Sequence, residues 1–209
     1  RRSNYKVQIS IMKKFKLETP CIINKFDKHL EVKNVLINMI KETNADFLEE
    51  KNAYYGDLIH RLDWSKSQDN SRKWVKFLQP HLQKYFNDCA NKLGYQNSTI
   101  TNLWFQQYNK NGKHGWHTHT GNYTGVYYVK FSNRDAKTEI IDPFSQNKKI
   151  IINAKEGDII IFPSYVIHRA TEQKEDSEKI IISFNVDFRD IQPYLFKRID
   201  NLKGTNFNN

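Results

Sequence analysis

Short apolar segments separated by frequent turn signals fill the second half of the chain, and this pattern restricts the fold more than any other feature. Each segment is rich in Ile, Val, Phe and Tyr, the residues that β-strands favour. Turn-forming sequences such as Asn-Gly, Asp-Pro and Glu-Gly-Asp separate them. The segments span residues 100–108, 125–131, 138–141, 149–153, 158–162 and 179–188. Strands this short and this closely spaced predict a β-sandwich or a jelly roll, and of these we expect the jelly roll, a double-stranded β-helix.

The first half has a helical pattern instead. Apolar residues recur every three or four positions within 30–40 and again within 74–93. Ser71 is the expected N-cap of the second helix, and Gly94 is the expected residue just after its end. Residues 21–26 could add an outer strand. We therefore expect a mostly β fold in which N-terminal helices pack against the barrel.

The length of 209 residues suits a single domain with a sizeable core. Within that one domain, 1–209, we expect an N-terminal helical support region with the outer strand over 1–95. The jelly-roll core should cover 96–190, and residues 191–209 should form a C-terminal tail that is loose toward its end.

The formal charge of +10 has two interpretations. It could attract nucleic acid, or it could reflect an AT-rich genome, because Lys, Asn and Ile are abundant together. Since the basic residues are scattered along the chain, nucleic acid is possible as a partner but is not favoured. No apolar run approaches the ~18 residues of a membrane span. Cys21 and Cys89 lie far apart and predict reduced thiols in a cytoplasmic protein.

Three histidines form the candidate site. His117 and His119 make a His-x-His pair, and on a single strand such a pair points both rings to the same face. His168 follows an apolar strand and a Pro-containing bend. Three ligands on one side of a metal leave the opposite positions open for substrate and oxygen. Imidazole binds Fe, Zn, Cu and Ni, so the ligand type alone does not select the metal.

These residues resemble the motifs of Fe(II)- and 2-oxoglutarate-dependent oxygenases, especially the small phage and bacterial subgroup related to prolyl 4-hydroxylases. The resemblance covers roughly residues 102–188. Tyr108, Gly112 and His117 stand in the register of the Tyr, Gly and first metal-binding His of that family. The segment Gly-Asp-Ile-Ile-Ile-Phe-Pro is similar to the strand that leads to the distal ligand, here His168.

The resemblance implies a dioxygenase that uses Fe(II), 2-oxoglutarate and molecular oxygen, and that forms succinate and carbon dioxide while hydroxylating a substrate. By its position, Lys179 would bind the distal carboxylate of 2-oxoglutarate, assisted by Thr124 and Tyr108. Arg169 is the alternative residue for binding this carboxylate, in place of Lys179. Ser183 and Asn185 share a face of the last strand and are expected to line the cofactor end.

The chain departs from the family pattern at His119, which stands where the family has a carboxylate ligand. An Fe(II) held by three neutral imidazoles keeps its full charge and should favour an anionic co-ligand more strongly. The same ligands could hold Zn(II). Alternatively, His119 could swing away and leave its position to water.

Two other hypotheses remain open at this stage. One is a cupin-like metalloprotein that uses three histidines without 2-oxoglutarate. The other is a nucleic-acid-binding module without enzymatic activity. A protein side chain such as proline is suggested as the substrate only by the resemblance, and the sequence leaves the primary substrate and the oligomeric state open. If a phage encodes the chain, the expected location is the host cytoplasm.

Overall fold

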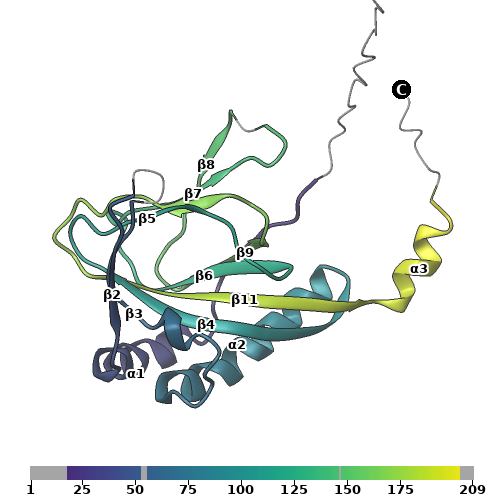
Figure 1. The fold of residues 1–209 in the computed structure, drawn as a ribbon. Coiled ribbons are helices and arrows are strands. Elements are labelled where there is room, and N and C mark those ends of the chain that lie inside the picture. The colour runs from purple at the N-terminus through teal and green to yellow at the C-terminus, as the bar shows by residue number, and fades with distance from the viewer. Residues whose placement is uncertain (1–17, 53–55, 146, 203–209) are drawn as a thin grey trace, which may run out of the picture.

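The computed structural model describes residues 18–52, 56–145 and 147–202 as two antiparallel β-sheets with helices on one side (Figure 1). The large sheet consists, in spatial order, of Ile22–Lys25 (β1), Asp158–Pro163 (β9), Tyr123–Lys130 (β6), Lys179–Ile191 (β11), Tyr95–Tyr108 (β4), Leu58–Leu62 (β3) and Asp46–Glu49 (β2). The small sheet consists of His114–His117 (β5), His168–Ala170 (β10), Thr138–Ile141 (β7) and Lys149–Ile151 (β8). The two sheets confirm the predicted jelly-roll class.

Strand β11 lies at the centre of the large sheet and separates two apolar cores. It pairs with β4 on one side and with β6 on the other. Its side chains alternate between the sheet faces. Ile180 and Ile182 belong to the core beneath the helices, whereas Ile181 belongs to the core between the sheets. The space between the sheets is therefore lined by every second residue of β11, beginning with Lys179.

Two helices cover the outer face of the large sheet, as Figure 1 shows. They are His29–Glu42 (α1) and Lys73–Lys92 (α2). The Phe86 ring of α2 lies 4.6 Å from the Phe184 ring of β11, measured between centroids. The prediction of Ser71 as N-cap is wrong, because Arg72 holds that position and the Ser71 N–H instead donates to Asp69 Oδ1. Gly94 follows the helix with φ of +85°, as its predicted place requires.

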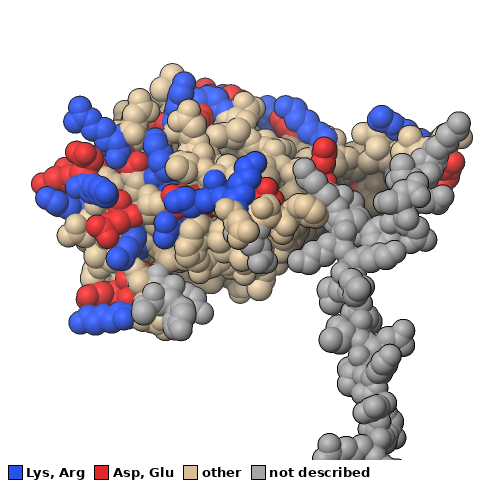
Figure 2. All heavy atoms as spheres, turned by 90° about the horizontal axis from the view of Figure 1, so that it is seen from above, with Lys and Arg blue, Asp and Glu red and all other residues tan. Residues whose placement is uncertain are grey.

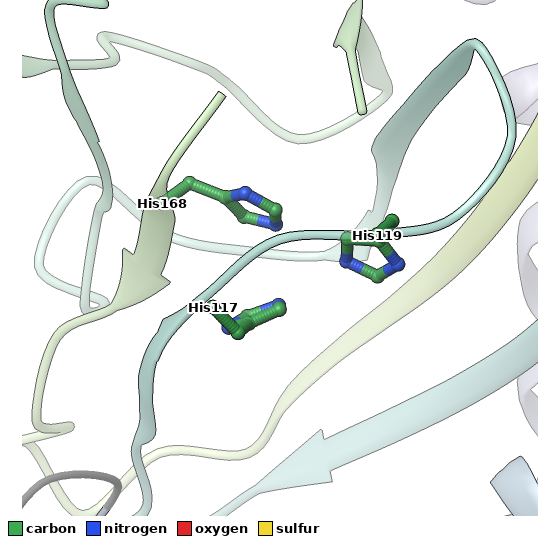
Figure 3. Close-up of side chains that lie close together, drawn as sticks. All are labelled: His117, His119 and His168. Atoms are coloured by element: carbon green, nitrogen blue, oxygen red, sulfur yellow. The ribbon is translucent and has the colours of Figure 1, made fainter. Parts of the chain in front are cut away.

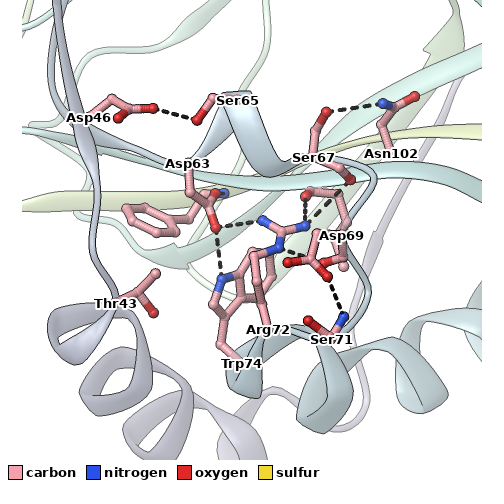
Figure 4. Close-up of polar contacts among 12 residues, drawn as sticks. Thr43, Asp46, Asp63, Ser65, Ser67, Asp69, Ser71, Arg72, Trp74 and Asn102 are labelled. Atoms are coloured by element: carbon pink, nitrogen blue, oxygen red, sulfur yellow. Dashed lines mark hydrogen bonds and ion pairs between the residues drawn. The ribbon is translucent and has the colours of Figure 1, made fainter.

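A buried polar cluster joins the start of α2 to β4 (Figure 4). The Asp63 carboxylate, which is 1% exposed, accepts hydrogen bonds from Arg72, from Trp74 Nε1 and from the backbone N–H of Phe105. Arg72 also donates to the carbonyl of Leu103 at 2.6 Å. Because the charge of Arg72 is paired and its donors are used, the cluster fixes β4 against the helix layer.

The N-terminal region contributes more β structure than its sequence predicts. Residues 21–26 do supply the outer strand β1, but β2 and β3 also belong to the large sheet. At the other end, the tail expected over 191–209 begins with a short helix, Pro193–Ile199 (α3), which has Pro193 in its first turn. The remaining tail, 203–209, lies outside the described residues.

The described part of the chain has no helix that is long and apolar enough to span a membrane. On the face shown in Figure 2, basic side chains alternate with acidic ones around a broad band of uncharged residues. Mixed charge of this kind does not form the continuous basic stripe that follows a nucleic acid backbone.

Candidate metal centre

The three candidate histidines come from two neighbouring strands of the small sheet and the segment that follows one of them. His117 ends β5 and stands opposite His168, the first residue of β10. His119 lies beyond the end of β5, where its N–H donates to the Ser164 carbonyl at 3.0 Å. The prediction that His117 and His119 share one strand is therefore wrong. The chain nevertheless brings one nitrogen from each ring within 4.8 Å of the others (Figure 3).

Local hydrogen bonds orient two of the rings. His117 Nδ1 lies 2.7 Å from the Gly115 carbonyl, and His168 Nδ1 lies 2.9 Å from the Val166 carbonyl. A carbonyl only accepts, so each Nδ1 carries the proton and each Nε2 is left with a free lone pair. Hydrogen bonds of this kind are typical of metal-binding histidines, in which they fix the tautomer and the direction of the ring.

Burial keeps these imidazoles neutral. Desolvation lowers the pKa of His168 well below its usual value, and the neighbouring His117 adds to the shift. Burial likewise lowers the pKa of His119 to about 4. The pKa of His117 is also lowered by burial, although the Gly115 carbonyl opposes the change. Metal binding requires neutral imidazole, so the site has its ligands in the required form at neutral pH.

The arrangement fits a divalent transition metal. Nitrogens bound to one ion at about 2.1 Å lie roughly 3 Å apart, so small ring rotations would bring these three onto a common ion. Iron and zinc both accept such a donor set.

A fourth histidine and a buried carboxylate lie beside the three. The His114 ring stacks on the His117 ring with centroids 3.8 Å apart. Its Nε2 faces Asp57 Oδ2 at 3.9 Å, while Asp57 Oδ1 accepts the Gly115 N–H at 2.6 Å. Burial and the nearby histidines lower the pKa of His114 well below its usual value, so it stays neutral beside the acid. Sequence reasoning missed Asp57, because no motif links it to the histidines.

Lys179 is buried between the sheets and is only 1% exposed. Its ammonium donates to the Ala136 carbonyl at 2.7 Å and lies 5.0 Å from the centre of the Tyr108 ring. Desolvation lowers its pKa to about 8, although the negative charge of Asp135 opposes the shift. The structure thus brings Lys179 next to Tyr108, as the predicted carboxylate site requires.

Thr124 lies far from this lysine. The register of β6 and β11 pairs Thr124 with Asn185, which is six residues beyond Lys179 and therefore about 20 Å further along the strand. The Thr124 hydroxyl donates to the Phe184 carbonyl at 2.8 Å. The structure does not bring Thr124 and Lys179 to one carboxylate. Tyr128, on the same face of β6, pairs with Ile181, which is only two residues from Lys179, and its hydroxyl forms a 2.7 Å hydrogen bond with Thr138.

Gln106 occupies the space between the histidines and Tyr108. Its Oε1 accepts hydrogen bonds from the hydroxyls of Tyr108 and Ser183, both at 3.1 Å. The cavity that remains there is about 20 Å³, which is room for roughly one water molecule. Ser183 lines this cavity, whereas Asn185 lines a second and larger cavity, of about 340 Å³, that shares His114, His117 and His119 with the first.

Arg169 is committed to another contact. Its guanidinium pairs with Glu139 at 2.7 Å and lies 4.4 Å from the centre of the Trp116 ring. Arg169, the alternative residue for binding the distal carboxylate, is therefore already paired with a carboxylate, whereas the hydrogen bond of Lys179 goes to a carbonyl.

Comparison with known proteins identifies this architecture. The model of a family described as "Putative 2OG-Fe(II) oxygenase" matches residues 102–185. No curated protein sequence matches the chain. Among solved structures, an oxidoreductase of the 2OG-Fe(II) oxygenase family from Burkholderia pseudomallei is similar with a TM-score of 0.63 and 10% identity, over 82% of this chain and 87% of that one.

Two further structures show how widely the fold is used. The viral collagen prolyl hydroxylase from Paramecium Bursaria Chlorella virus-1 has a TM-score of 0.55 and 15% identity, covering 80% of this chain and 94% of its own. The non-heme alpha ketoglutarate dependent epimerase of nogalamycin biosynthesis has a TM-score of 0.61 and 10% identity, covering 89% and 86%. At these identities the likeness concerns the fold alone, which hosts more than one reaction.

Proposed function

We propose that this chain is a 2OG-Fe(II) oxygenase, like the family whose model matches residues 102–185, and that it hydroxylates a C–H bond of its primary substrate. In the overall reaction the substrate, 2-oxoglutarate and dioxygen become the hydroxylated substrate, succinate and carbon dioxide. Fe(II) and 2-oxoglutarate, the family's cofactors, supply the oxidising chemistry. The observation that carries the proposal is the convergence of His117, His119 and His168, two of them with Nδ1 tied to a carbonyl.

The roles of the protein's own residues follow from their contacts. His117, His119 and His168 would hold the metal as neutral ligands. Lys179 would pair with the distal carboxylate of 2-oxoglutarate, because it is a buried cation opposed only by a carbonyl at hydrogen-bond distance. Tyr108 would form one wall beside it. Since 2-oxoglutarate is larger than the cavity of about 20 Å³, its binding requires Gln106 or its neighbours to move.

An anaerobic titration tests the cofactor site. Fe(II) or Mn(II) followed by 2-oxoglutarate should raise the unfolding temperature of the wild type in two steps. Lys179→Met should keep the first step and lose the second, whereas Lys110→Met, an exposed control, should keep both. A wild type that responds to the metal but not to 2-oxoglutarate would contradict the proposal and indicate a three-histidine metalloprotein of another kind.

His119 needs its own comparison, because it replaces the carboxylate of the family pattern. His119→Ala should lower metal content after dialysis, as expected for loss of a ligand, whereas His119→Asp should retain it. Unchanged metal content in His119→Ala would show that His119 is not a ligand.

Succinate detection with candidate substrates tests the reaction, and peptidyl proline is the first candidate because a structural neighbour is named as a prolyl hydroxylase. We also place the protein in a cytoplasm, or in a host cytoplasm if a phage encodes it, because Cys21 and Cys89 are free thiols.

A further inference from the structure

The ring of His119 is held differently from the other two candidate ligands. His117 and His168 each donate to the backbone carbonyl two residues earlier. The His119 ring instead lies nearly parallel to the rings of Trp104 and His168, with centroids 5.7 Å and 5.1 Å apart. Such contacts fix the plane of an imidazole but not which nitrogen faces a metal, because a half-turn of the ring keeps the same plane. Selecting the nitrogen takes a hydrogen-bond acceptor.

Asn185 offers an acceptor beside this ring. It belongs to β11, is 2% exposed, and lines the larger cavity together with His119. Its Oδ1 is buried and makes no hydrogen bond of normal geometry among the described residues. A buried acceptor without a donor costs about 1–3 kcal/mol, so a neighbouring N–H that turns toward it would stabilise the protein.

Other contacts settle which end of the Asn185 amide is available. Its Nδ2 donates to Asn102 Oδ1 at 3.3 Å, and Asn102 Nδ2 in turn donates to Ser67 Oγ at 3.1 Å. Figure 4 shows the contact between Ser67 and Asn102, which adjoins the buried cluster around Arg72. Because Asn102 holds the Nδ2 end, the Oδ1 end is the one left for His119.

The effect of Asn185 on His119 agrees with this orientation. Burial lowers the pKa of His119, whereas the contact with Asn185 opposes the lowering. An acceptor favours the protonated ring and acts in this direction, whereas a donor would act in the opposite one.

We infer that Asn185 is a positioning residue for the metal centre, whose Oδ1 accepts the ring N–H of His119 and so directs the other ring nitrogen to the metal. The inference rests on the proposed function, because it needs His119 as a ligand. It also gives a reason for an amide beside this particular ligand. A carboxylate, which the family pattern has here, has no tautomer to select, whereas a neutral imidazole offers a lone pair on only one nitrogen.

The test is a double-mutant cycle in metal affinity. Co(II) binding is followed by the visible absorption of the bound ion, in competition with a chelator, for the wild type, Asn185→Leu, His119→Asp and the double variant. Asn185→Leu should weaken Co(II) binding about tenfold to a hundredfold, as the loss of an outer hydrogen bond to a ligand does. In the His119→Asp protein the same substitution should change the affinity less than about threefold, because no ring N–H remains to be accepted.

Two variants control for a general structural effect. Asn34→Leu makes the same change at an exposed position of α1 and should leave Co(II) affinity unchanged. Asn185→Asp keeps an acceptor oxygen and should retain most of the affinity that Asn185→Leu loses. The inference is overturned by an unchanged affinity in Asn185→Leu, or by an equal loss with and without His119.

Proton NMR of the Zn(II)-loaded protein gives a second readout that does not depend on affinity. Ring N–H protons that are hydrogen-bonded in metal-bound histidines appear far downfield, so the wild type should show one from each of His117, His119 and His168. Asn185→Leu should lose the His119 signal alone, and the signals of His117 and His168 show that the variant has folded. A His119 signal that persists in Asn185→Leu would contradict the role of Asn185.

The same titrations separate this inference from the proposed function. A wild type that binds Co(II) and responds to 2-oxoglutarate, together with an Asn185→Leu protein of normal affinity, would remove only the role of Asn185. A wild type that binds neither Co(II) nor Zn(II) would remove the metal centre and this inference with it.

Discussion

Replacing Lys179 with Met should make the metal-free protein more stable at neutral pH. Burial lowers the pKa of Lys179 from 10.5 to about 8, so its charged form is destabilised in the folded state. The difference of about 2.5 pH units corresponds to roughly 3 kcal/mol at pH 7. The variant also loses the hydrogen bond to the Ala136 carbonyl, which contributes about 1 kcal/mol. The expected net gain is therefore about 2 kcal/mol.

The difference in the free energy of unfolding between Lys179→Met and the wild type should also change with pH. Between the folded pKa of about 8 and the unfolded value of 10.5, the unfolded chain binds more protons at Lys179 than the folded chain does. The stability that Lys179 contributes therefore rises with pH across this window, and the cost of the buried charge is fully present below it. The advantage of the Met variant should shrink above pH 8 and change sign near ~pH 10.

Guanidinium unfolding of both proteins between pH 7 and pH 10, without metal or 2-oxoglutarate, measures the effect. The control Lys110→Met makes the same chemical change at an exposed position and should alter the free energy of unfolding by less than about 0.5 kcal/mol at every pH. The reasoning is refuted if Lys179→Met is less stable than the wild type at pH 7, or if its difference from the wild type does not change with pH.

Three other substitutions or modifications test the fold. Asp63→Ala leaves the Arg72 charge buried without its partner and should lower the free energy of unfolding by about 3–5 kcal/mol in denaturant titrations. Gly125→Ala should prevent normal folding, seen as a large loss of unfolding temperature, because a Cβ there would lie 1.9 Å from a backbone carbonyl of β9. In the native protein a thiol reagent should label exposed Cys21 rapidly, whereas buried Cys89, with its pKa raised by burial to about 11, should react only after unfolding; equal rates would contradict this burial.

The sequence predicts the parts of the fold whose pattern is complete within a single segment. The long apolar strands and the two helices are of this kind, because each carries its own periodicity and its own turn signals. Strands β2 and β10 are too short to show a periodic pattern of their own, and they are strands because a neighbour supplies hydrogen bonds. The helix α3 did have a signal, Pro193 in its first turn, which the prediction of a tail overlooked.

The residues of the candidate site also fall into those that a single segment predicts and those that it does not. The histidines and Lys179 are predicted from their positions relative to the apolar strands. The inward direction of the Lys179 side chain follows from the alternation of side chains along β11. The distance between Thr124 and Lys179 depends instead on how β6 and β11 pair, including a register shift beside Ile180. Such pairing is a property of two strands together. Asp57 lies beside the histidines because the next residue, Leu58, pairs with Lys113. This pairing joins two segments that are far apart in the sequence.

The hydrogen bonds from His117 and His168 each go to the carbonyl two residues earlier, Gly115 and Val166. Each ring is thus held by a three-residue unit that needs no other part of the protein to set its direction. The conformational entropy of these side chains is lost when the chain folds, before any ion arrives. Metal uptake would then lose little further entropy at these two ligands, and most of the remaining ordering would fall on His119, whose ring has no such hydrogen bond to a neighbouring backbone carbonyl among the described contacts.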